Sequence, residues 1–173
     1  YHTLHEFVAI LEAANTTLFQ RGKGSFLLTT LSAALKIGET LHIVSVGDSP
    51  GYLIREGEIV GLTTATGNPS LFGIANALGR RARLSYTAQE LTLQPRDRVV
   101  LVTDGILDNI APAELAVLAQ RAASPQEAVT QLQDLLAARK RTNLGRRDDY
   151  SGFRSDDATA SIRFIDERVV TSG

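Results

Sequence analysis

The amino-acid sequence predicts a layered α+β domain with an antiparallel sheet core. Three observations indicate this class: an apolar stripe with helical spacing at the start, a series of short alternating strands after it, and two successive helices before a returning strand. This order does not fit a doubly wound nucleotide-binding fold. With 173 residues, of which 43% are hydrophobic, the chain is expected to form one domain with a sizeable core over residues 1–173.

The first half is expected to hold one helix followed by strands. Apolar residues recur with helical spacing over about residues 3–20, and the Gly-containing segment 21–24 ends that helix. Strands are then expected at 25–37, 41–46, 51–55 and 58–62, separated by turns at Gly38-Glu39, 47–50 and Glu56-Gly57. This succession predicts an antiparallel meander. Residues 63–82 are rich in Gly and are expected to form a loop over the sheet.

The second half is expected to alternate strands with a pair of helices. Strands are expected at 83–93, 98–103 and 158–165. One helix begins near Pro112. A second has Ser124 as its N-cap and Pro125 in its first turn, and runs to about residue 138. Residues 139–155 are polar and are expected to form a mobile surface loop. Its basic run, 139–147, is expected to be either simply solvated or used to dock acidic or phosphorylated partners.

Composition excludes several classes of function. Eighteen basic and 19 acidic side chains give a net charge of −1, so neither nucleic acid nor a membrane is expected as a partner. No apolar run approaches the roughly 20 residues that span a bilayer, and a cytoplasmic location is expected. The absence of Cys excludes cysteine nucleophiles and thiolate zinc sites, and three His residues offer little for a histidine-based site. Catalysis is therefore expected to depend on carboxylates.

Acidic residues occur where predicted strands begin or end. Asp48 follows the strand at 41–46, Asp104 and Asp108 follow the buried strand at 98–103, and Asp156 and Asp157 precede the last strand. Carboxylates at strand ends can converge on one pole of a sheet and hold a divalent cation there.

Simpler explanations remain for each of these acids. Asp48 can occupy an ordinary turn, Asp108 can cap the helix near Pro112, and Asp156 and Asp157 can merely end a charged loop. The segment Gly22-Lys23-Gly24-Ser25 has the wrong spacing for a phosphate loop and is better explained as a helix stop.

Several short motifs occur in a fixed order along nearly the whole chain. They are Gly24-Ser25 with Thr29-Thr30, Val46-Gly47-Asp48-Ser49, Leu62-Thr63, Pro95-Arg96-Asp97-Arg98, Thr103-Asp104-Gly105-Ile106-Leu107-Asp108-Asn109, and Asp156-Asp157-Ala158-Thr159. In order and spacing they resemble the metal-dependent serine/threonine protein phosphatases of type 2C. The resemblance implies an antiparallel β-sandwich flanked by helices, with two Mn²⁺ or Mg²⁺ ions at one end and a third, weaker metal position beside the pair. It also implies hydrolysis of phosphoserine and phosphothreonine in proteins by a metal-bound hydroxide, without a nucleophilic side chain.

The resemblance also assigns roles to residues of this chain. Asp104 and Asp156 would bind the two ions, and Asp48 and Asp108 would line the third, weaker position. Four further residues would support these ligands: Ser49, Gly105, Asn109 and Asp157. Pro50 stands where relatives commonly have Arg, so a positioning role for that Arg is not expected here.

The chain departs from the resemblance at its beginning. Relatives carry an Asp-Gly-x-Gly-Gly turn that supplies the bridging aspartate, and this sequence contains none. The sequence also lacks Met, so we expect a processed or N-terminally incomplete phosphatase domain. Because Mn²⁺ and Mg²⁺ require several oxygen ligands, residues 1–173 alone are expected to bind metal poorly and to show little activity.

Two further functional hypotheses remain open. The chain can be a non-catalytic phosphatase-like module with a regulatory or interaction role, or a general α+β interaction domain whose acidic turns are coincidental. Mn²⁺-dependent phosphatase activity distinguishes the enzyme from both. The oligomeric state is not predicted.

Overall fold

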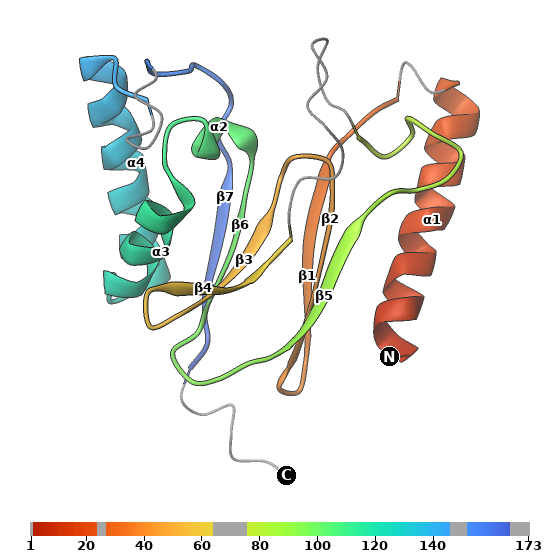
Figure 1. Ribbon diagram of the computed structural model, residues 1–173, viewed down its shortest axis with the longest axis horizontal. Coiled ribbons are helices and arrows are strands. Elements are labelled where there is room, and N and C mark those ends of the chain that lie inside the picture. Colours follow the sequence, from red (N-terminus) through yellow and green to blue (C-terminus); the bar gives the residue numbers. More distant parts are fainter. Residues whose placement is uncertain (1, 24–26, 64–75, 146–151, 167–173) are drawn as a thin grey trace. The chain divides into compact units, whose positions relative to one another are not determined.

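The computed structural model describes residues 2–23, 27–63, 76–145 and 152–166 (Figure 1). Its contacts divide the chain into two compact units, which are considered separately below. The first unit comprises residues 1–51 and 63–92, and the second comprises residues 52–62 and 93–173. The expectation of a single domain stays a prediction.

The first unit consists of a three-stranded sheet and one long helix. Strands β1 (Leu31–Ile37), β2 (Thr40–Val46) and β5 (Thr87–Thr92) pair antiparallel in the order β1-β2-β5. Helix α1 (His2–Gly22) places Val8 and Leu11 against Val44 and Val46 of β2 in one apolar cluster. The helix therefore covers one face of this sheet.

The second unit consists of a four-stranded sheet and three helices. Its strands are β3 (Gly51–Arg55), β4 (Glu58–Leu62), β6 (Arg98–Val102) and β7 (Ala160–Phe164), in the order β4-β3-β6-β7. The helices are α2 (Asp104–Leu107), α3 (Pro112–Arg121) and α4 (Pro125–Thr142). Val100 of β6, Leu115 of α3 and Leu132 of α4 are almost fully buried in its core.

Local sequence signals explain the turns and the helix starts. The β3–β4 hairpin turns at Glu56 and Gly57, both with positive φ, as a two-residue turn of this hand requires. Ser124 caps α4 by accepting a hydrogen bond from the Glu127 backbone N–H at 3.1 Å, and Pro125 occupies the first turn. The predicted hairpin turn and the predicted cap are confirmed.

Two predicted strands are longer than the strands in the structure, because residues ahead of each paired strand make other tertiary contacts. The strand expected at 25–37 starts at Leu31, since Thr29 instead forms an isolated bridge with Leu78. The strand expected at 83–93 starts at Thr87, because the preceding segment is held against α1 by the side chain of Asn15. Residues 24–26 and most of the loop expected at 63–82 lie outside the described residues.

The predicted meander is wrong. Strand β2 pairs with β1 and β5, whereas β3 and β4 belong to the other sheet, so the chain changes sheets at residues 47–50. The predicted surface loop at 139–155 is also wrong at its start, because residues 139–142 continue α4 and Arg139 is buried. The α+β class, with two sheets and helices, is confirmed. No helix in the described part of the chain is long and apolar enough to cross a membrane.

Candidate metal centre

Three of the predicted ligands belong to the second unit. Asp104 is the first residue of α2, separated from β6 by Thr103 alone, and Asp108 is the residue at which α2 ends. Asp156 precedes β7 and is exposed. Asp48 belongs to the first unit, in the turn that follows β2.

Thr103 ties the segment that carries Asp104 to the segment that precedes β7. Its backbone N–H donates to the carbonyl oxygen of Thr159 at 3.0 Å, and its hydroxyl accepts from the Thr159 N–H at 2.9 Å. These two bonds extend the pairing of β6 with β7 past its last regular pair, Val102 and Ala160. Asp104 therefore emerges beside the chain that leads back to Asp156.

Gly105 allows the two segments to touch. A Cβ at this position would lie 2.4 Å from the carbonyl oxygen of Asp157 and 3.2 Å from the Cα of Ala158. Those atoms belong to the backbone and cannot move away as a flexible side chain could. Any other residue type at position 105 would therefore push the two segments apart. The close approach at Gly105 therefore requires glycine, and its support of a metal ligand stays a prediction.

Asn109 fastens the same two segments from the other end of α2. Its side-chain amide donates to the carbonyl oxygens of Gly105 at 3.1 Å and Arg154 at 2.8 Å, and its Oδ1 accepts from the Arg154 N–H at 2.9 Å. The residue is 1% exposed. A buried amide that satisfies both its donor and its acceptor holds its partners in one geometry.

Sequence reasoning missed a further support, formed by Arg139 and Glu114. Arg139 of α4 donates one hydrogen bond to the carbonyl oxygen of Asn109 and forms a 2.6 Å ion pair with Glu114 of α3. Glu114 also accepts from the Ala111 N–H at 3.2 Å. Nothing near Arg139 in the sequence distinguishes it from the other basic residues around it, because its partners lie 25 and 30 positions away.

The carboxylates themselves are held by short-range contacts. Asp104 accepts a hydrogen bond from the Gly105 N–H at 2.9 Å, and Asp156 accepts one from the Asp157 N–H at 2.7 Å. Asp108 lies 3.4 Å from the guanidinium of Arg154. It does not cap α3, whose N-cap is Ala111.

The described residues offer the right type of ligand for a hard divalent cation, but too few of them. Carboxylate oxygens are the ligands that Mn²⁺ and Mg²⁺ prefer, and Asp104 and Asp156 lie on touching segments. Within the described ranges, however, no group of three or more His, Cys, Asp or Glu side chains gathers closely enough to hold a metal ion. The described residues therefore supply only part of the ligand set that such an ion needs.

The turn that carries Asp48 is built tightly within the first unit. Gly47 has φ +96°, and a Cβ there would lie 2.6 Å from the side chain of Thr30. The hydroxyl of Ser49 lies 3.1 Å from that of Thr30, which gives Ser49 an anchoring role in this turn. Asp48 itself is half-buried.

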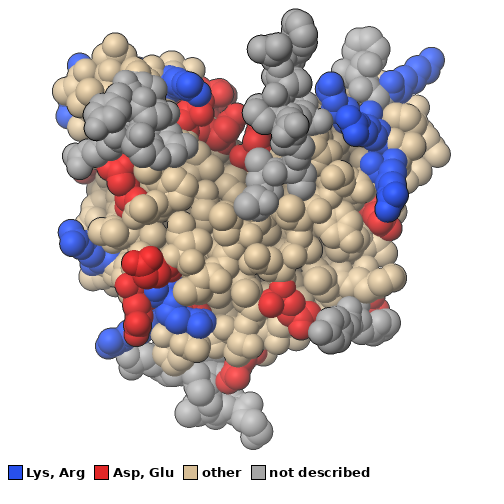
Figure 2. Space-filling view, in the orientation of Figure 1, with Lys and Arg blue, Asp and Glu red and all other residues tan. Residues whose placement is uncertain are grey.

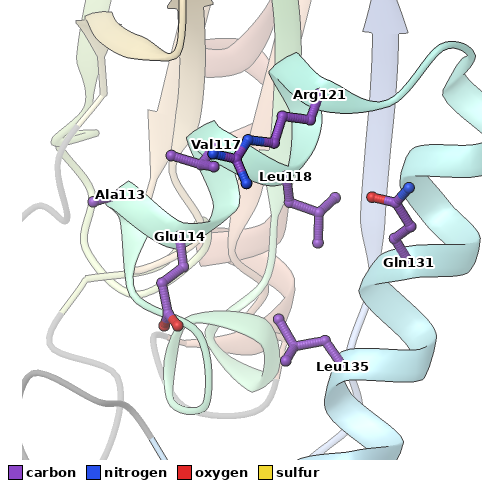
Figure 3. A pocket seen from close by; sticks show the side chains of 7 residues that line it. All are labelled: Ala113, Glu114, Val117, Leu118, Arg121, Gln131 and Leu135. Carbon is purple, nitrogen blue, oxygen red and sulfur yellow. The ribbon is translucent and has the colours of Figure 1, made fainter.

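A separate groove lies between α3 and α4 in the second unit (Figure 3). Its volume is about 520 Å³, and its lining is mainly apolar, with Val117, Leu118 and Leu135 among the side chains shown. Its single carboxylate, Glu114, is engaged by Arg139. The groove therefore lacks the ligands that phosphate chemistry with a metal requires.

Comparison with known proteins gives one family match and several relatives. The family model of stage II sporulation protein E (SpoIIE) matches residues 2–159. The probable protein phosphatase 2C 55 of Arabidopsis thaliana is 25% identical over 172 residues, which cover 90% of this chain and 36% of that protein.

Solved structures with low sequence identity share the fold. PppA, a key regulatory component of the T6SS in Pseudomonas aeruginosa, is 20% identical, with a TM-score of 0.67 over 90% of this chain and 66% of that one. The serine/threonine phosphatase Stp1 from Staphylococcus aureus is 21% identical, with a TM-score of 0.65 over 78% of this chain and 62% of that one. This chain thus spans about a third of the plant relative and under two thirds of Stp1. The resemblance to type 2C phosphatases is confirmed.

Proposed function

Because this chain belongs to the stage II sporulation protein E (SpoIIE) family, we propose that it acts as a metal-dependent protein serine/threonine phosphatase. The observation that carries the proposal is the fastening of the Asp104 segment to the Asp156 segment by Thr103, Gly105 and Asn109. Two carboxylates on segments held together in this way would supply part of the oxygen ligands that a phosphoryl-transfer site with divalent ions requires.

Asp104 and Asp156 would hold the Mn²⁺ or Mg²⁺ ions, and Asp48 and Asp108 would contribute to a third position. When bound, the ions would supply a water of lowered pKa and neutralise the charge of the phosphate. Asn109 would fix the separation of the two ligand segments, and Arg139 would fix Asn109 through its carbonyl oxygen. The substrate would be a protein that carries phosphoserine or phosphothreonine.

The test is release of phosphate from a phosphothreonine peptide by the intact gene product, with Mn²⁺ and then with excess chelator. Activity that requires Mn²⁺ and disappears in D104N supports the proposal. Activity that persists in chelator contradicts it.

A second candidate function is a phosphatase-like regulatory or interaction module without catalysis. The absence of a three-donor group among the described residues favours it. The same assay separates the two, because this module would show no turnover at any Mn²⁺ concentration while retaining its fold.

A further inference from the structure

The first unit presents five cations at the end of α1 and on the segment that leads to β5. They are Arg21, Lys23, Arg80, Arg81 and Arg83, and all five are exposed. The two segments that contain them, residues 13–23 and 76–86, have no Asp or Glu. In Figure 2, Lys and Arg side chains gather at the upper right, where α1 ends. We call these five residues the basic patch.

The segment with the three arginines is held in a fixed position. Asn15 of α1, which is 1% exposed, donates to the carbonyl oxygens of Arg81 at 3.0 Å and Ala82 at 3.3 Å, and accepts from the Gly79 N–H at 2.9 Å. Gly79 has φ +82°, and a Cβ there would lie 2.1 Å from the carbonyl oxygen of Leu27. The arginines therefore project from an ordered backbone.

Contacts among the described residues do not explain the basic patch. Across the part of the chain that the structure describes, none of its five side chains forms an ion pair or a hydrogen bond. Arg21 lies in the last turn of α1, where a cation interacts favourably with the helix dipole. This accounts for only one of the five charges. Like charges held together repel each other, so an anionic partner would stabilise the arrangement.

The basic patch adjoins the turn that carries Asp48. A Cβ on Gly47 would lie 3.0 Å from the carbonyl oxygen of Asn76, and Asn76 begins the described part of the segment that carries the arginines. The Asn76 side chain donates to the carbonyl oxygen of Ser85 at 2.7 Å, which closes this segment into a loop. A peptide that reaches the Asp48 turn would therefore pass beside the cations.

We propose that the basic patch docks an acidic or phosphorylated stretch that flanks the target residue of a protein substrate. The proposal rests on the proposed phosphatase function and names a feature of its substrates. Arginine is suited to this role because its planar guanidinium binds carboxylate and phosphate in a two-pronged geometry.

Protein is favoured over nucleic acid as the partner. Sequence-tolerant binding of single strands uses aromatic side chains for base stacking. Tyr86 is the exposed aromatic residue of these two segments, and it lines a different groove with Leu4, His5 and Val8, on the N-terminal half of α1. The basic patch thus offers cations without a stacking surface.

The test measures binding of a fluorescent phosphothreonine peptide with Asp and Glu on both sides, by anisotropy in chelator, where no metal-dependent turnover occurs. The comparison peptide has Asn and Gln in place of those acids. The wild-type chain is expected to prefer the acidic peptide. The triple variant R80Q/R81Q/R83Q is expected to weaken that binding about tenfold and to leave the comparison peptide almost unchanged.

The matched control is R121Q/K140Q/R141Q, which removes three exposed cations from α3 and α4. This control is expected to change affinity less than about twofold, since these charges lie outside the basic patch. Equal losses in the two triple variants would overturn the proposal, as would equal affinity of the wild-type chain for the two peptides. Tighter, arginine-dependent binding of a single-stranded RNA or of phosphatidylserine vesicles would also overturn it.

A second readout uses turnover. In the active protein, R80Q/R81Q/R83Q is expected to raise KM for the acidic phosphopeptide while KM for a small aryl phosphate stays unchanged. If no phosphopeptide is hydrolysed by the wild-type protein, the proposed phosphatase function fails, while the anisotropy measurement still decides whether the basic patch binds acidic peptides.

Discussion

Asn109 and Arg154 form a reciprocal pair of hydrogen bonds across 45 positions of sequence, in which the amide of Asn109 both donates to and accepts from the backbone of Arg154. The pair connects the end of α2 to the segment that carries Asp156. The relative position of these two segments therefore depends on a buried, neutral side chain.

Replacement of Asn109 tests this dependence. N109A removes three side-chain hydrogen bonds from a buried position and is expected to lower the free energy of unfolding by about 2–4 kcal/mol. N109D is expected to retain the bond from the Arg154 N–H, but its carboxylate faces the carbonyl oxygens of Gly105 and Arg154. Urea unfolding measures both variants, and stability unchanged in N109A would contradict the assigned role.

Gly105 is expected to tolerate no side chain. In G105A the new methyl group would meet the Asp157 carbonyl, so the two ligand segments must separate, at a cost of about 1–3 kcal/mol. The matched control is G152A, where the nearest atom would lie 3.5 Å away and no positive φ is required. Thermal unfolding compares the two variants. Equal effects would show that the close approach at Gly105 is unimportant.

Asp104 is expected to be required for activity and not for folding. D104A in the intact gene product should abolish Mn²⁺-dependent hydrolysis of a phosphopeptide, because it removes an oxygen ligand at the surface end of β6 without changing the apolar core. D134A, which removes an exposed carboxylate from α4, should retain full activity. Normal turnover by D104A would refute its role as a ligand, and a large loss of stability in metal-free buffer would assign it a structural one.

Metal binding by residues 1–173 is expected to be weak. The described residues gather no group of three or more His, Cys, Asp or Glu, and divalent ions of this kind need six or more oxygen ligands, some of which can be water. Titration calorimetry with Mn²⁺ measures the affinity. An assay with an aryl phosphate measures the low activity that is expected of the same residues. Tight binding with robust turnover would show that another residue completes the site.

The ion pair between Arg55 and Asp97 is expected to stabilise the second unit. Asp97 is fully buried, and Arg55 donates two hydrogen bonds to it, both at 2.8 Å. D97N leaves the guanidinium without its counter-ion and is expected to cost about 3 kcal/mol, whereas D166N at an exposed position should cost little. Chemical denaturation gives both values.

The pH dependence of this pair follows from the arginine. The hydrogen bond to Asp97 raises the pKa of Arg55 above its ordinary value. A group whose pKa is raised on folding contributes its stability below the ordinary pKa and loses it only as pH rises through the raised one. The arginine's share of the stability should therefore stay constant through neutral and moderately alkaline pH, which unfolding measured between pH 7 and 9 can check.

Elements with strong local signals could be predicted from the sequence. The turn at Glu56-Gly57, the cap at Ser124 and the helix start at Pro112 depend on residues within four positions of one another, so their physical cause is visible in the chain. The ordered motifs likewise sufficed for the type 2C resemblance. Asp104 and Asp156 remain predicted ligands.

Only the tertiary structure decided which strands pair and what supports the candidate site. Strand β2 is followed in sequence by β3, and the sequence predicts that the two pair. Strand β2 pairs instead with β1 and β5, because strand pairing depends on which sheet faces become buried. Arg139 looks like one cation of a solvated run, yet α4 carries it into the second unit's interior against Glu114 and Asn109. Both outcomes depend on contacts between residues far apart in the chain, whose free energy appears only when the fold brings them together.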